Sequence, residues 1–101
     1  MTTRNVSAKI IPVLESQGVL KAALFGSVVR GEAKKKSDID ILVKLKRGKT
    51  LIDLVKLQHL LEDELGQKVD LLTYGSIHPL LKGIILEEQQ VIYEKGSTNF
   101  S

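Results

Sequence analysis

The stretch DIDILVKL, residues 38–45, constrains the fold most strongly, because acidic and large apolar residues alternate along it. Side chains alternate across a β-strand, so the pattern predicts a strand with one buried face, formed by Ile39, Ile41 and Val43. Asp38 and Asp40 then share the other face, about 7 Å apart along the backbone. Two ionised carboxylates this close repel each other unless protonation, a cationic partner or a bound metal ion relieves the repulsion.

A third aspartate, Asp70, follows the same rule in the segment KVDLLTY, residues 68–74. Its neighbours Val69 and Leu71 would face the core and leave Asp70 on the opposite side. If this strand pairs with 38–45, all three carboxylates can meet. Mg²⁺ prefers oxygen ligands, retains some waters and is often completed by substrate phosphates, so the three aspartates predict a magnesium site. For the D-x-D pattern alone, a solvated or lysine-bonded aspartate pair at a strand edge is the simpler interpretation.

The rest of the pattern predicts an α/β (α+β) fold, a small mixed β-sheet with helices packed on it. Helices are expected around 6–14, at 27–31, at 51–65 and from Pro79 onward, and further strands at 20–25 and 90–94. Pro12 lies inside the first helix and would kink it or delay its start. In the last helix, Leu80, Ile84 and Ile85 are expected to pack inward.

Composition narrows the class of protein. A chain of 101 residues that is 43% hydrophobic suits one domain, which we place at 1–95, followed by a frayed tail at 96–101. A net charge of +3 and an aromatic content of 4% make nucleic acid a poor candidate partner. The absence of cysteine excludes disulfides, thiolate zinc sites and cysteine nucleophiles. With no signal-peptide pattern and no apolar run of about 20 residues, we expect a cytoplasmic protein and no membrane partner.

A glycine-serine pair precedes the first acidic strand, at a predicted strand-to-helix junction. Gly26 lets the backbone approach a phosphate closely, and the following residues present free N–H groups at a helix N-terminus. Ser27 adds a hydroxyl, and Arg30, one turn further on, could bind a phosphate through two hydrogen bonds. Ordinary N-capping by Ser27 and a surface Arg30 form the simpler alternative. The order of the two features is what indicates a function: a candidate polyanion site lies directly before a candidate dication site.

The combined pattern resembles the nucleotidyltransferase superfamily that includes DNA polymerase β. It consists of G-S-x-x-R-G, a short spacer, S-D-I-D in a strand, and a later strand aspartate. The short length is similar to the minimal nucleotidyltransferase (MNT) branch of prokaryotes, and the resemblance covers roughly residues 5–95. The matching residues are Gly26, Ser27, Arg30, Gly31, Ser37, Asp38, Asp40 and Asp70. The resemblance implies the nucleotidyltransferase fold.

The resemblance also implies how the carboxylates act. Asp38 and Asp40 would bind Mg²⁺, and Asp70 would complete a second metal site and help to deprotonate the acceptor hydroxyl. Two metal ions would stabilise the entering and leaving oxygens, so that no serine or histidine nucleophile is required.

The same resemblance implies how the nucleotide is held. Gly26 and Ser27 would bind the terminal phosphates of ATP, with Arg30 and Ser37 in supporting roles. The lysine run 34–36 is expected to be a solvated loop, with a lesser prospect of attracting triphosphate. His59 and His78 are expected to be structural, although His78 lies closer to the predicted site.

Members of the MNT branch resemble antitoxins that pair with a helical HEPN-domain ribonuclease toxin and add AMP to a toxin tyrosine. The resemblance therefore implies adenylylation of a partner protein that depends on Mg²⁺ and ATP. Two alternatives stay open. A small-molecule acceptor such as an aminoglycoside would require an acidic pocket, and the only acidic cluster outside the three aspartates is 62–64. A non-catalytic module that neutralises a toxin by contact would not need the three aspartates.

Overall fold

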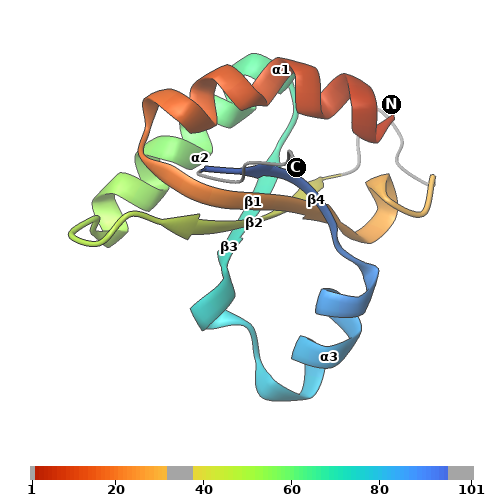
Figure 1. Cartoon of the computed structure of the whole chain (residues 1–101). Helices are drawn as coiled ribbons and strands as arrows, with labels where there is room; N and C mark the ends of the chain where they lie inside the picture. Colours follow the sequence, from red (N-terminus) through yellow and green to blue (C-terminus); the bar gives the residue numbers. More distant parts are fainter. Residues whose placement is uncertain (1, 32–37, 96–101) are drawn as a thin grey trace, which may run out of the picture.

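The computed structural model describes residues 2–31 and 38–95, so the predicted tail at 96–101 lies outside the described residues (Figure 1). Three α-helices are present in this part: α1 (Thr3–Ser16), α2 (Leu51–Leu65) and α3 (Pro79–Glu88). The strands are β1 (Val19–Phe25), β2 (Ile39–Leu45), β3 (Val69–Thr73) and β4 (Gln90–Glu94). Two single-turn 3-10 helices, η1 (Gly26–Val28) and η2 (Tyr74–Ser76), follow β1 and β3.

The four strands form one mixed sheet in the order β3-β2-β1-β4. β2 and β3 run parallel, whereas β1 is antiparallel to both β2 and β4. Helices α1 and α2 cover one face of the sheet, and α3 lies on the other side (Figure 1). The predicted fold class, a small mixed sheet with helices packed on it, is confirmed.

The main core lies between the sheet and the pair α1 and α2. The alternating residues Ile39, Ile41 and Val43 of β2 are fully buried there, as the sequence pattern predicts. They pack with Val6, Ile10 and Leu14 of α1 and with Leu57, Leu61 and Leu65 of α2. The opposite face carries a smaller cluster of Ala23, Phe25, Leu42 and Ile77. This unequal division leaves part of the second face without a helix above it.

Helix α1 is continuous from Thr3 to Ser16, and Pro12 lies inside it. The expectation that Pro12 delays the start of the helix is wrong. The helix begins early because the Thr2 side chain accepts a hydrogen bond from the Asn5 N–H, at 3.2 Å, and so caps the first turn. Burial of three residues on one side of α1 then offsets the backbone hydrogen bond that a proline removes.

Helix α2 has the bounds that the sequence predicts, and its ends explain why. Thr50 and Asp53 form a capping box at the N-terminus. Gly66, at φ +65°, ends the helix in the left-handed conformation that glycine accepts most readily. This helix is the crossover that parallel strands require, and it carries the chain from β2 to β3.

Two predictions near the second face need correction. The expected helix at 27–31 is only the single turn η1, from Gly26 to Val28. In α3, Ile85 packs inward with Leu86, but Leu80 and Ile84 are 82% and 63% exposed. The second-face cluster is small, and only the C-terminal half of α3 reaches it.

None of the helices in the described residues is both long and apolar enough to cross a membrane.

Candidate active site

The parallel pairing of β2 and β3 brings Asp40 and Asp70 directly opposite each other. Phe25, at the end of β1, pairs with Asp40 from the other side. The flanking residues of each aspartate point into the main core, so both carboxylates lie on the second face of the sheet. We call this side the acidic face. Asp40 is half-buried, and Asp70 is exposed.

Asp38 lies just before β2 and is exposed. The expected strand at 38–45 therefore begins one residue late, at Ile39. Asp38 is nonetheless close enough to act on Asp40 electrostatically. The structure thus joins all three aspartates in one electrostatic group, with Asp40 and Asp70 as its closest members.

The pKa of Asp40 is raised to about 6, chiefly because burial removes water from the charged form. The negative charges of Asp70 and Asp38 raise the pKa further, and so does a hydrogen bond with Asp70. The nearby Arg30 guanidinium lowers it, but by less. The charged form of Asp40 is therefore disfavoured both by burial and by two neighbouring carboxylates, and a nearby cation would stabilise it.

The residues fit a magnesium site. In the described part of the chain, no three carboxylate, histidine or cysteine side chains converge around a single point, so the expectation that Asp38, Asp40 and Asp70 meet in one metal cluster is wrong. Mg²⁺ does not require such a cage, because one or two carboxylates, waters and substrate phosphates commonly complete its octahedral shell. The paired Asp40 and Asp70, with the solvent-exposed Asp38 beside them, supply oxygen ligands of this kind.

The glycine-serine turn is in direct contact with the acidic pair. Gly26 is buried, has φ +75°, and lies so close to Asp40 that an added β-carbon would overlap the carboxylate oxygen Oδ2. Its carbonyl accepts hydrogen bonds from the N–H groups of Val29, at 3.1 Å, and Arg30, at 3.2 Å. Among the described residues, the N–H groups of Ser27 and Val28 make no backbone hydrogen bond to a residue outside the turn. The turn therefore has two N–H donors that a ligand could use.

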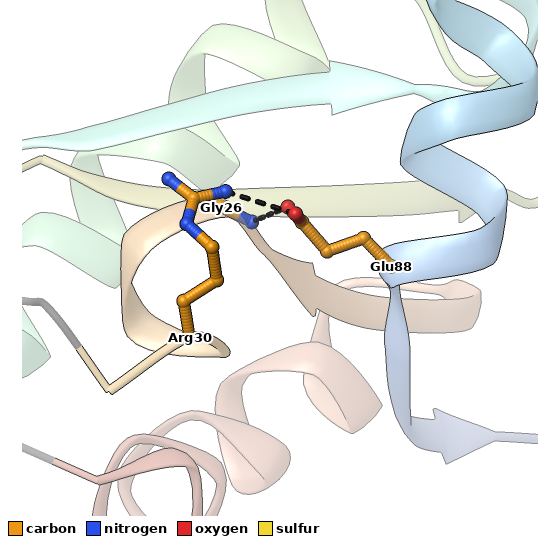
Figure 2. A network of polar contacts seen from close by, with 3 residues as sticks. All are labelled: Gly26, Arg30 and Glu88. Carbon is orange, nitrogen blue, oxygen red and sulfur yellow. Dashed lines mark hydrogen bonds and ion pairs between the residues drawn. The ribbon is translucent and has the colours of Figure 1, made fainter.

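Arg30 and the Gly26 N–H both bind a residue that the sequence patterns do not single out. The Glu88 carboxylate accepts from the Gly26 N–H at 2.7 Å and from Arg30 Nη1 at 2.9 Å (Figure 2). These two hydrogen bonds hold the pKa of Glu88 below its usual value. One signal was available, because an acidic residue in the last turn of a helix is unfavourable and implies a partner elsewhere.

Other predicted residues are placed as follows. Ser37 and the lysine run 34–36 lie outside the described residues. His59 is on the exposed side of α2, which covers the opposite face of the sheet. His78 has a structural role, since its Nδ1 accepts from the Leu80 N–H at 3.1 Å and caps α3. Glu62, in the acidic cluster, accepts from the Val69 N–H at 3.0 Å and so attaches α2 to the start of β3.

A four-stranded mixed sheet with paired strand aspartates and an adjoining glycine-serine turn defines a domain for nucleotide chemistry. Comparison with known proteins makes the class specific: the chain belongs to the nucleotidyltransferase domain family, which matches residues 7–92. The predicted family membership, and with it the prediction of a nucleotidyltransferase enzyme, is confirmed.

Three similar proteins refine this assignment. The chain is 54% identical to a Methanocaldococcus jannaschii protein provisionally named a protein adenylyltransferase, over 87% of this chain and 95% of that protein. A solved structure, provisionally described as a minimal nucleotidyltransferase, superposes with a TM-score of 0.76 at 34% identity, over 86% of this chain and 89% of that one. A toxin–antitoxin complex with AMP-PNP contains a chain that matches with a TM-score of 0.76 at 26% identity, over 89% of this chain and 74% of that one.

Proposed function

We propose that this protein is an antitoxin that transfers AMP from ATP, with Mg²⁺, to a tyrosine hydroxyl of a HEPN-type toxin. The observation that carries the proposal is the pairing of Asp40 with Asp70 beside the turn at Gly26. A relative at 54% identity is named for protein adenylylation, and a structural neighbour is a toxin–antitoxin complex that contains AMP-PNP. Use of ATP also favours a cytoplasmic location.

The three aspartates would hold the metal ions. Asp38 and Asp40 would bind Mg²⁺, and Asp70 would complete a second metal site. Burial raises the pKa of Asp40 most, and the charges of Asp70 and Asp38 raise it further, so a bound cation would stabilise its charged form. Bound Mg²⁺ would offset the charge of the triphosphate and stabilise the oxygens that enter and leave the α-phosphorus.

The turn would hold the terminal phosphates. The N–H groups of Ser27 and Val28 and the Ser27 hydroxyl are the donors available for phosphate oxygens, and Gly26 allows their close approach to Asp40. Arg30 would contribute positive charge from the edge of the turn, and Ser37 would support the same region. This arrangement directs the departing pyrophosphate toward the turn and leaves the α-phosphorus near the carboxylates.

The acceptor is activated by a carboxylate. A tyrosine phenol has an unperturbed pKa of about 10, so it needs a base to become nucleophilic at neutral pH. Asp70 is exposed on the acidic face, where an incoming hydroxyl can reach it. As the phenol oxygen bonds to the α-phosphorus, its proton passes to Asp70 and the bond to pyrophosphate breaks.

The test combines the protein, its cognate toxin, Mg²⁺ and ATP labelled at the α-phosphate. We expect label on the toxin, and a loss of about a hundredfold or more in Asp40→Ala and Asp70→Asn. The matched control is Asp63→Ala, an exposed acid on α2, which should transfer label normally. The same assay with all four nucleoside triphosphates gives the base preference.

Two results would favour the alternatives. Full neutralisation of the toxin by Asp40→Ala without any transfer indicates a binding module. Label on a small hydroxyl compound but never on the toxin indicates a small-molecule enzyme.

A further inference from the structure

Glu88 connects two segments that are far apart in the sequence. It is the last residue of α3, and its carboxylate spans Gly26 and Arg30, which are 62 and 58 residues away along the chain (Figure 2). Each carboxylate oxygen takes one donor: Oε1 binds the Gly26 N–H, and Oε2 binds Arg30 Nη1. The hydrogen bond to the Gly26 N–H is partly buried, whereas the ion pair with Arg30 is exposed to solvent, because the Arg30 side chain is 48% exposed.

With this contact, both polar backbone groups of Gly26 are fixed. The carbonyl is held by the turn's own N–H groups, and the N–H is held by Glu88. Glycine at φ +75° has more backbone freedom than any other residue, so external hydrogen bonds matter most at such a position. The Ser27 and Val28 N–H groups follow Gly26 directly, so we expect their orientation to depend on these bonds.

The chain directly after Glu88 is anchored by two backbone contacts. The residue after it, Gln89, donates its N–H to the Ile85 carbonyl at 2.8 Å and ends α3. Two residues after Glu88, Gln90 pairs with Leu24 at the start of β4. The Glu88 backbone is therefore fixed to β1, the same strand that ends at the turn. A residue anchored in this way suits a permanent support better than a group that leaves when substrate arrives.

We propose that Glu88 is a positioning residue for ATP: it holds the Gly26 peptide so that the Ser27 and Val28 N–H groups face the terminal phosphates. This role rests on the proposed function. The Gly26 N–H is then not itself a phosphate donor, because a protein carboxylate already uses it. Glu88 also forms an ion pair with Arg30, whose positive charge acts on Asp40.

The experiment measures nucleotide affinity and turn order in three variants. Glu88→Ala removes both acceptors, Glu88→Gln keeps one carbonyl oxygen for the Gly26 N–H, and Glu87→Gln is the control at an exposed neighbour. For Glu88→Ala we expect a KM for ATP about tenfold higher, with kcat within about twofold, because the loss lies in substrate positioning. Glu88→Gln should fall between Glu88→Ala and the wild type, and Glu87→Gln should match the wild type.

Two readouts do not need turnover. Calorimetry with Mg²⁺ and AMP-PNP should show the same loss of affinity, and hydrogen exchange should show a protected Gly26 amide that becomes exposed in Glu88→Ala. If Glu88→Ala fails to fold, the same two readouts on Glu88→Gln decide the question. Unchanged or tighter nucleotide binding in these variants overturns the role, the latter because it means that Glu88 competes with phosphate.

A failure of the proposed function would give results different from a failure of the positioning role of Glu88. A wild-type protein that binds AMP-PNP but never transfers AMP refutes the transfer and leaves the role of Glu88 intact. A wild-type protein that binds no nucleotide refutes both.

Discussion

Gly26 and Asp40 lie so close together that position 26 has no room for a side chain. A β-carbon at position 26 would overlap Oδ2 of Asp40 and lie 3.1 Å from its Cγ. The turn that would bind phosphate and the carboxylate that would bind metal are therefore one packed unit, and a change in either displaces the other.

Gly26→Ala should consequently damage both stability and activity. The left-handed backbone costs an alanine about 1–2 kcal/mol, and the displaced Asp40 should lower transfer by about a hundredfold. Gly66→Ala is the matched control, because Gly66 has φ +65° but nothing within 4 Å of an added β-carbon. Gly66→Ala should lose only the stability that the left-handed backbone costs, and it should keep full transfer. Chemical unfolding and the labelled-ATP assay measure the two effects, and normal transfer by Gly26→Ala would contradict the close packing.

The raised pKa of Asp40 predicts a pH dependence for the metal-free protein. Its folded pKa of about 6 lies above the ordinary value of 3.8, so the folded state binds more protons than the unfolded state between these values. Its contribution is fully favourable below pH 3.8 and is lost as pH rises through about 6. Unfolding midpoints measured in chelator should therefore fall over this range, relative to Asp40→Asn, which cannot titrate. If the unfolding midpoints of the wild type and Asp40→Asn changed with pH in parallel, Asp40 would not titrate in this way.

Metal ions should reverse this loss. Millimolar Mg²⁺ at pH 7.5 should raise the unfolding temperature by several degrees, since a ligand at a hundred times its Kd stabilises a protein by about 2.7 kcal/mol. The effect should fade below pH 6, where protons compete for Asp40. Asp70→Asn should lose most of the effect, and Asp63→Asn on α2 should retain it. Equal stabilisation of all three proteins would indicate a nonspecific ion effect.

The capping box of α2 should contribute to stability without affecting chemistry. Thr50 accepts from the Asp53 N–H, and Asp53 accepts from the Thr50 N–H at 2.8 Å. Thr50→Ala should lower the free energy of unfolding by about 1 kcal/mol. Thr50→Ser keeps the hydroxyl and should restore most of that loss, and both variants should transfer AMP at the wild-type rate. A stable Thr50→Ala protein would mean that the cap is redundant.

Local patterns account for the parts of the structure that the sequence predicts well. In β2, the alternation of Ile39, Asp40 and Ile41 determines which face each side chain takes, and the structure buries both isoleucines. Helix α2 has a threonine cap at one end and Gly66 at the other, so its bounds are also local information.

The remaining features depend on contacts between distant segments. Helix α3 is rich in apolar residues on several sides, so its sequence does not specify which of them pack inward, and Leu80 and Ile84 are exposed instead. The hydrogen bond from Gly26 to Glu88 spans 62 residues and follows no periodic pattern. The unfavourable place of Glu88 at the end of a helix indicates that it has a partner, but only the three-dimensional arrangement of α3 and β1 shows that the partner is Gly26.

The parallel register of β2 and β3 has a consequence for folding. If β3 slid past β2 by one residue, Asp70 would turn beneath α2, and Val69 and Leu71 would face water. Such a slip would expose apolar side chains that the correct register buries. The hydrophobic core therefore also fixes the register that places Asp70 opposite Asp40. A chain with the wrong register would therefore be unfolded, and it would not accumulate as a folded domain with misplaced aspartates.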